Sequence, residues 1–340
     1  MDPHEVEPGT RRHFVRTLTL TAAAGLVGLS PGVEAAEPPP ETASVRFSTY
    51  PASCIAAQWV AEELLRAEGF IDIRYVAVPD DIPSGRLLAT GRVDFSIEAA
   101  PVIPVYVDGG APLVTLAGLH PGCFELFAQQ SIRTIRGLKD RSVSVPAEGD
   151  ERHVFVSAML AHVGLDPRRD VKWDFRPSDQ GLQRFVEGKV DAYLGFPPDP
   201  QELRARKIGR VIVDTLTDRP WSQYFCCMLT ANRTFVRDRP AATMRVLRAV
   251  LKAVGVCAAE PERVARMITE KGYESRQDYA AQVLKQLPYA RWREYPPDDT
   301  LRFYALRLHE AGLIKSNPKK VIADAGDWRF LNELKKELKG

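Results

Sequence analysis

Short apolar runs and segments with helical spacing alternate along the chain from residue 45 onward. A strand is predicted over 45–50, and the apolar residues after it keep helical spacing from Ser53, a possible N-cap, to Gly69. Further strands are predicted over 73–78, 93–97 and 112–119, and helices around 87–88 and 102–107. Strands that alternate with helices favour an α/β fold with a mainly parallel sheet.

The same order of elements begins again after Leu138. Strands are predicted over 142–145 and 171–175, and helices over 152–163 and 181–187. The segment Gly91–Asp94 (G-R-V-D) returns 97 positions later as Gly188–Asp191 (G-K-V-D), each time after an amphipathic helix and at the start of a strand. A four-residue match can arise by chance, but the matching context favours an internal repeat. We therefore expect two lobes of similar construction.

Two strand-like segments, 124–129 and 223–230, flank the second half and predict that the chain crosses between the lobes twice, as in a hinge. From Pro240 onward the apolar positions keep helical spacing, which predicts helices that complete the first lobe. The expected lobe 1 comprises 45–127 together with 228–340, and lobe 2 comprises 128–227. Each lobe is expected to be a mainly parallel sheet flanked by helices.

The N-terminal segment has the layout of an export signal. Arg11 and Arg12 precede an apolar run of about 12 residues, which is shorter than the roughly 20 that span a bilayer, so a membrane anchor is the weaker alternative. Residues 1–35 predict a twin-arginine signal peptide, and 36–44 a Pro-rich extended spacer. The G-x-S-x-G pattern at 28–32 lies inside the signal and lacks the strand and helix of a hydrolase nucleophile. We expect a soluble periplasmic protein.

Charge and cysteine content narrow the class further. Removal of residues 1–35 takes three arginines and four acids from totals of 46 and 44, which changes the net charge from +2 to +3. This balance favours neither nucleic acid nor a membrane surface as a partner. The five cysteines lack C-x-x-C spacing, which argues against a disulfide framework or structural zinc. We expect a monomer without a cofactor.

Together, the strand and helix at 45–65, the two G-[RK]-V-D turns, the crossing at 224–232 and the Arg239–Ala241 (R-P-A) lead into a helix resemble a known family. This is the type 2 periplasmic solute-binding proteins of ABC importers, in the branch of aliphatic-sulfonate, taurine and nitrate receptors and NMT1/THI5-like proteins. The resemblance covers 45 to about 315. It implies that a small molecule is trapped between two lobes and delivered to an ABC transporter permease.

Two other classes share this fold. One is an enzyme, such as a THI5-like pyrimidine synthase or a metal-dependent enzyme, and the other is the effector domain of a transcription regulator. The export signal argues against a synthase with cytosolic substrates, and residues 1–44 hold no helix-turn-helix. A receptor without catalytic residues is therefore the leading hypothesis.

Ligands of open α/β sheets bind beyond the carboxyl ends of the strands. Five loops are thus nominated: 49–54, 98–101, 120–123, 146–150 and 195–198. The candidate ligand-binding residues are Tyr50, Ser53, Cys54, Glu98, His120, Glu148, Gly149, Phe196 and Trp221. Free N–H groups at Ser53, Cys54 and Gly149 suit a polar or anionic group. The rings of Tyr50, Phe196 and Trp221 offer flat surfaces for an aromatic ligand.

Acidic residues in these loops bear on the ligand's charge. Glu98 follows an apolar strand and is predicted to face the cleft, where it could pair with an amine, although a solvated loop position is the alternative. Glu148 and Asp150 are interpreted in the same two ways. If several of them face inward, the acidic cleft favours a cationic or neutral nitrogenous ligand, such as a pyrimidine, over sulfonate or nitrate.

The cysteines allow one further kind of site. Cys54, His120, Cys123 and one of Cys226 or Cys227 could gather as soft ligands for a transition metal. Neighbours on a strand point to opposite faces, which makes joint binding by Cys226 and Cys227 awkward. Buried thiols that act as small apolar side chains are the default, and no metal is expected.

Overall fold

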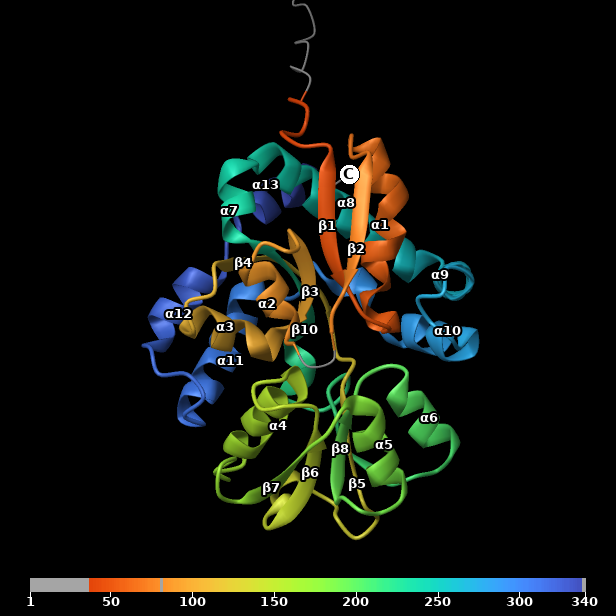
Figure 1. Ribbon diagram of the computed structural model, residues 1–340, viewed down its shortest axis with the longest axis vertical. Helices are drawn as coiled ribbons and strands as arrows, with labels where there is room; N and C mark the ends of the chain where they lie inside the picture. The colour runs from red at the N-terminus through yellow and green to blue at the C-terminus, as the bar shows by residue number, and fades with distance from the viewer. Residues whose placement is uncertain (1–36, 80–81, 338–340) are drawn as a thin grey trace, which may run out of the picture. The chain divides into compact units, whose positions relative to one another are not determined.

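Two five-stranded sheets organise the computed structural model, which describes residues 37–79 and 82–337 (Figure 1). The strand order is β2-β1-β3-β10-β4 in the first sheet and β7-β6-β8-β5-β9 in the second. The first sheet contains β1 Ser44–Thr49, β2 Asp72–Ala77, β3 Phe95–Ala99, β4 Leu113–Pro121 and β10 Phe225–Asn232. The second contains β5 Glu125–Ala128, β6 Arg141–Val145, β7 Val171–Phe175, β8 Ala192–Gly195 and β9 Arg210–Asp214.

Each sheet combines four parallel strands with one antiparallel strand, which is β10 in the first sheet and β5 in the second. β1 runs parallel to β2 and β3, whereas β10 is antiparallel to β3 and β4. β6 runs parallel to β7 and β8, whereas β5 is antiparallel to β8 and β9. The predicted crossing segments are thus strands inside the sheets. The chain passes between the sheets at 122–124 and 215–224, slightly before the predicted lobe limits.

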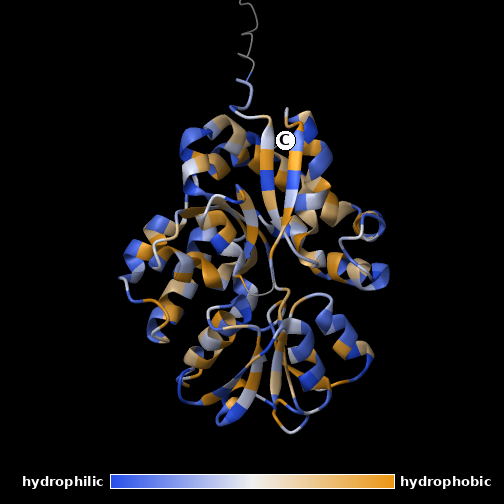
Figure 2. Cartoon of the chain, in the orientation of Figure 1, coloured by the Kyte–Doolittle hydropathy of each residue, from blue (hydrophilic) through white to orange (hydrophobic). Residues whose placement is uncertain are grey.

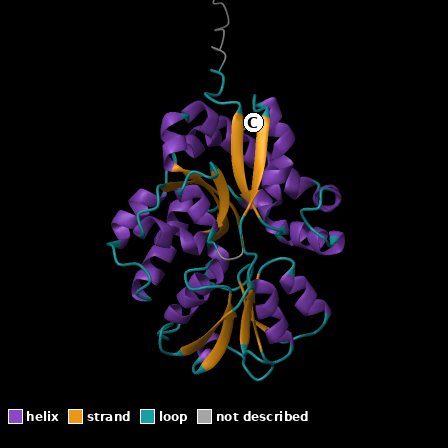
Figure 3. Ribbon diagram, in the orientation of Figure 1, coloured by secondary structure: helices purple, strands orange, loops and turns teal. Residues whose placement is uncertain are grey.

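Helices lie on both sides of the strands (Figure 3), which confirms the predicted α/β class. Five 3-10 turns accompany them among the described residues: η1 Ser53–Ile55, η2 Ala100–Val102, η3 Ile135–Leu138, η4 Trp221–Gln223 and η5 Tyr289–Arg291. The helices up to the second crossing are α1 Ala56–Ala67, α2 Ser84–Ala89, α3 Ile103–Asp108, α4 Glu151–His162, α5 Ser178–Val186 and α6 Asp199–Ala205. The later helices are α7 Arg233–Asp238, α8 Pro240–Ala259, α9 Pro261–Glu270, α10 Gln277–Gln286, α11 Pro297–Glu310, α12 Pro318–Ala325 and α13 Arg329–Glu337.

The C-terminal helices do more than complete the first lobe. α8 packs against α1, whereas α11 packs against α4 beside the second sheet. The rings of Tyr304 and Phe155 make this contact, with their centres 5.7 Å apart. Sequence periodicity identified α11 as a helix but did not indicate a second partner.

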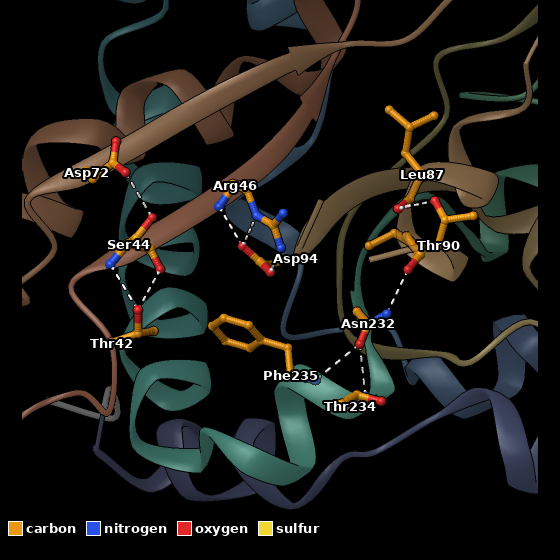
Figure 4. Close-up of polar contacts among 11 residues, drawn as sticks. Thr42, Ser44, Arg46, Asp72, Leu87, Thr90, Asp94, Asn232, Thr234 and Phe235 are labelled. Atoms are coloured by element: carbon orange, nitrogen blue, oxygen red, sulfur yellow. Dashed lines mark hydrogen bonds and ion pairs between the residues drawn. The ribbon is translucent and has the colours of Figure 1, made fainter. Parts of the chain in front are cut away.

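The G-[RK]-V-D repeat is structural. Gly91 and Gly188 have φ values of +68° and +71°, a conformation that favours glycine. The Asp94 carboxylate accepts a hydrogen bond from the backbone N–H of Arg46 at 2.9 Å and also binds the Arg46 side chain (Figure 4). In the second copy, Asp191 accepts from the N–H of Ser142 at 2.8 Å. Each aspartate ties the third strand of the parallel set to the first.

Three neighbouring strands of the first sheet, β3, β10 and β4, are buried on both faces. Every residue of β3, β4 and β10 is buried, because helices cover both sides of these strands. Orange and blue segments alternate along the outer helices, as expected for helices with one buried face (Figure 2). At the end of β10, Asn232 caps α7 and donates to the carbonyl of Leu88 at 2.7 Å (Figure 4).

The predicted signal peptide, residues 1–35, lies outside the described residues. Residues 37–43 of the predicted spacer contain neither helix nor strand, and Glu41 accepts hydrogen bonds from the N–H groups of Ala241 and Ala242, at 2.9 and 2.8 Å. This carboxylate caps the N-terminus of α8. Across 37–79 and 82–337, none of the helices combines the length and apolar character that a membrane crossing needs.

Candidate functional site

A cleft of about 110 Å³ lies between loops of the two sheets. Its first-sheet side follows β1 and β2 and reaches α2 and α3, and its second-sheet side follows β6, β7 and β8. The lining residues are Tyr50, Val78, Pro79, Ile82, Pro83, Ser84, Tyr106, Pro146, Asp150, Glu151, Arg152, Ser178 and Phe196. Most of them lie at the carboxyl ends of strands, where parallel sheets bind ligands.

Three of the five nominated loops line this cleft: 49–54, 146–150 and 195–198. The loops 98–101 and 120–123 contribute no residue to the described lining. Instead, Val78 and Pro79, the residues 82–84 and the start of α5 at Ser178 contribute to it. Periodicity located α2 and α5 but gave no sign that the first residue of each lies in a cleft between the two sheets.

Two adjacent carboxyl groups line the second-sheet side of the cleft. Asp150 is the N-cap of α4 and accepts from the N–H of Arg152 at 2.9 Å. Burial raises the pKa of Asp150. Burial and the neighbouring Asp150 charge raise the pKa of Glu151 to about 8. Glu151 is therefore largely protonated at neutral pH, where it can donate a hydrogen bond, and it can pair with a cationic ligand once it ionises.

Arg152 is the one positively charged residue of the described cleft lining, and other residues of the protein already contact its guanidinium group. Arg152 is only 3% exposed. Its Nη1 donates to the Ser178 hydroxyl, and its Nη2 lies 3.6 Å from Oδ2 of Asp199. The guanidinium carbon lies 4.4 Å from the ring centre of Phe196. These contacts fix both Arg152 and the aromatic wall of the cleft.

Glu98 lies one layer behind the cleft. It is buried in β3, and its Oε2 accepts from the hydroxyl of Ser84, a lining residue, at 2.6 Å. Its Oε1 has no hydrogen-bond partner among the residues that the structure describes. Burial raises the pKa of Glu98. Glu98 therefore does not line the cleft itself but contacts a lining residue, Ser84.

Two of the three predicted aromatic residues meet across the cleft. The rings of Tyr50 and Phe196 come from opposite sheets, and their centres are 6.1 Å apart at an interplanar angle of 80°. Trp221 requires a correction. It is 2% exposed and packs edge-on against Phe155 and Phe303, so it belongs to the core.

Three further candidates lie away from the cleft lining. Ser53 is buried and does not cap a helix, because its hydroxyl donates to Oε2 of Glu274 at 2.8 Å. The N–H of Gly149 donates to Nδ1 of His153 at 3.2 Å and is therefore already engaged. Glu148 is exposed. Of the paired acids in this loop, Asp150 lines the cleft and Glu148 does not.

The remaining candidates, Cys54 and His120, belong to a buried cluster. The sulfurs of Cys54, Cys123 and Cys227 all lie within 4.8 Å of one another, and Sγ of Cys226 lies 2.8 Å from that of Cys123. Nε2 of His120 lies 3.0 Å from the Cys54 carbonyl oxygen, and Nδ1 faces the carbonyl oxygens of the following two residues. His120 thus orients the Cys54 backbone, and both candidates lie outside the cleft lining.

Sequence analysis missed Glu151, Arg152, Ser84, Tyr106 and Ser178. For Glu151 a signal was present, because it directly follows a nominated loop and opens a helix. An acid in a first helical turn is, however, common for electrostatic reasons alone. The other four become lining residues only through the packing of one sheet's loops against the other's.

This arrangement is the periplasmic binding protein fold. The structure is similar to the alkanesulfonate-binding protein SsuA from Xanthomonas axonopodis pv. citri bound to MOPS, with a TM-score of 0.67 and 16% identity over 86% of this chain and 100% of that one. It is also similar to the periplasmic nitrate-binding protein NrtA from Synechocystis PCC 6803, with a TM-score of 0.67 and 14% identity over 88% of this chain and 90% of that one.

The fold also occurs with other bound molecules. DszB, in complex with biphenyl-2-sulfinic acid, matches with a TM-score of 0.59 and 17% identity over 86% of this chain and 99% of that one. No curated protein sequence matches the chain. The model of the NMT1-like family matches residues 86–269, more than half of the chain. The chain therefore belongs to the NMT1-like family.

Proposed function

We propose that this protein is an extracytoplasmic solute-binding receptor of an ABC importer, which holds a small nitrogenous molecule between its lobes. The observation that carries the proposal is the cleft that both sheets line at the carboxyl ends of their strands. Tyr50 and Phe196 face each other there from opposite sheets. A ligand seated among these loops would contact both halves at once and favour their closure. The similarity to periplasmic binding proteins supports this function.

The charge of the cleft favours a cationic or neutral ligand with hydrogen-bond donors. Asp150 and Glu151 line it, and Glu98 stands behind Ser84. The Arg152 charge lies near Asp199 and above an aromatic ring. A protonated amine or a pyrimidine could pair with the carboxyl groups and pack against the rings. The ligand class thus differs from the sulfonate and nitrate of the proteins named above.

The location and partners of the receptor follow from this role. Residues 1–35 would direct twin-arginine export to the periplasm, where a monomer would deliver its ligand to an inner-membrane ABC permease. Lobe 1 (45–127 with 228–340) and lobe 2 (128–227) would close about the crossings at 122–124 and 215–224. A matched pair of crossings permits such hinge motion with little change inside each lobe.

A thermal-stability screen of the purified protein against amines, pyrimidines, sulfonates and aromatic acids tests this function. A true ligand at a hundredfold excess over its Kd adds about 2.7 kcal/mol to the free energy of unfolding. We expect such a shift from amines or pyrimidines. Stabilisation by sulfonates alone would contradict the ligand class, and no stabilisation by any compound would contradict the receptor function itself.

An enzyme on this fold is the second candidate, and the raised pKa of Glu151 favours it, since perturbed acids cluster in active sites. The stabilising compound decides between the two functions. After prolonged incubation with the protein, recovery of the unchanged compound supports a receptor. Conversion of the compound that depends on Glu151 would instead establish catalysis.

A further inference from the structure

Three distant segments bring thiol groups together beside the first crossing of the chain. Cys54 belongs to the turn before α1, Cys123 to the crossing between β4 and β5, and Cys227 to β10. All three side chains are at most 9% exposed. Of the other two cysteines, Cys226 lies next to this group and Cys257 lies in α8. Ordinary apolar packing predicts that thiols lie among carbon atoms, whereas here sulfur is gathered with sulfur.

The spacing of the sulfurs suits coordination of one ion. A metal ion that binds two thiolates at about 2.3 Å with tetrahedral or trigonal angles separates their sulfurs by about 3.8–4.0 Å. The sulfurs of Cys123 and Cys227 are 3.9 Å apart, and all three lie within 4.8 Å of one another. A small contraction would therefore place all three at bonding distance from a common centre.

The cluster also has a route for entry. Cys123 lines a second cavity, of about 240 Å³, on which Glu125, Arg204 and Asp214 also border. This cavity is separate from the cleft described above, because the two share no lining residue. An ion could thus reach the sulfurs without passing through the ligand cleft, as a metal site requires.

The geometry points to a binding site for one thiophilic metal ion, of the Zn²⁺ or Cu⁺ class, held by the sulfurs of Cys54, Cys123 and Cys227. Soft thiolate ligands select such ions, and each coordinating thiol releases its proton to solvent on binding. His120 is not a ligand, because both of its ring nitrogens face carbonyl oxygens. Cys226 lies beside Cys123 as a neighbour of the site. A bound ion would cross-link the first crossing to β10 and to the turn before α1.

A Cd²⁺ titration of the reduced protein without oxygen tests this site, with thiolate-to-metal charge-transfer absorption as the readout. We expect one equivalent to bind, and an excess of Zn²⁺ or Cu⁺ to displace it. Cys54→Ser and Cys227→Ser should each lower the Cd²⁺ affinity by at least about 100-fold, since loss of even an outer-shell partner costs 10–100-fold. Cys257→Ser is the matched control, because it removes a buried thiol outside the cluster and should leave the titration unchanged.

Several outcomes would overturn the site. One is the absence of charge-transfer absorption from the reduced wild-type protein, a result that does not depend on any variant folding. Another is full binding by Cys227→Ser, or loss of binding in Cys226→Ser while Cys54→Ser retains it, since that pattern contradicts the assigned ligands. Circular dichroism of each variant shows whether it is folded. The ligand screen reports on binding in the separate cleft between the sheets. Absence of metal binding would therefore not contradict the proposed receptor function.

Discussion

Glu151→Gln should stabilise the protein at neutral and alkaline pH. The pKa of Glu151 is raised from an ordinary 4.5 to about 8 by burial and by the charge of Asp150. The folded protein therefore holds this proton more tightly than the unfolded chain does. Stability from this group is complete below about pH 4.5 and falls as the pH rises toward 8, because over this range the unfolded chain ionises while the folded protein keeps its proton. Glutamine keeps the shape and cannot ionise.

The size of the effect follows from the shift. Each pKa unit corresponds to about 1.4 kcal/mol, so a shift of roughly 3.5 units sets a ceiling of about 5 kcal/mol once the titration is complete. At pH 7 the folded group is still mainly protonated, and the cost accumulated by then is about 3 kcal/mol. The difference between variant and wild type should thus grow by up to about 1.4 kcal/mol per pH unit from pH 5 to 7.

Urea unfolding at pH 5, 6, 7 and 8 measures this difference directly. Glu148→Gln is the matched control, because Glu148 lies three residues earlier and is exposed. Its free energy of unfolding should stay within about 0.5 kcal/mol of wild type at every pH. A pH-independent difference for Glu151→Gln, or a variant less stable than wild type at pH 8, would refute the assigned burial of this carboxyl group.

Three other changes probe separate parts of the structure. Ser53→Ala removes the hydrogen bond to the buried Glu274 carboxyl group and should lower the urea-derived stability by about 1–3 kcal/mol; no loss would place Ser53 elsewhere. Asp191→Ala frees the N–H and hydroxyl of Ser142 and should cost a similar amount with an unchanged m-value, and a neutral result would deny the repeat a structural role. Phe196→Ala removes one aromatic wall and should weaken an aromatic ligand at least tenfold by calorimetry, whereas unchanged affinity would move the ligand out of this cleft.

Sequence reasoning succeeded where the signal is local. Alternating periodicities placed the strands and helices of both sheets, because hydrophobic spacing follows directly from which face is buried. The G-[RK]-V-D repeat was also visible, since its glycine and aspartate satisfy backbone requirements within a short turn. The same logic located the loops after β1, β6 and β8 as parts of the cleft.

Sequence reasoning failed where two contacting residues are far apart in the chain. The hydroxyl of Ser53 meets Glu274, 221 residues away, and the ring of Trp221 packs against α11, so neither is free for a ligand. Adjacent Cys226 and Cys227 were expected on opposite faces. The pairing of β10 with β4 is irregular between Phe225 and Met228, and both sulfurs lie within 4 Å of Cys123. Such contacts depend on tertiary packing, which no local pattern encodes.

Calorimetric titration of the best nitrogenous ligand into wild type, Glu151→Gln and Glu148→Gln is the most direct measurement of the cleft's function. We predict one bound molecule per chain, an affinity for a cationic ligand that rises as the pH approaches 8 and Glu151 ionises, and at least tenfold weaker binding, about 1.4 kcal/mol, by Glu151→Gln. Glu148→Gln should bind like wild type. Equal affinity in all three proteins across this pH range would contradict a ligand held between the lobes by the acidic cleft.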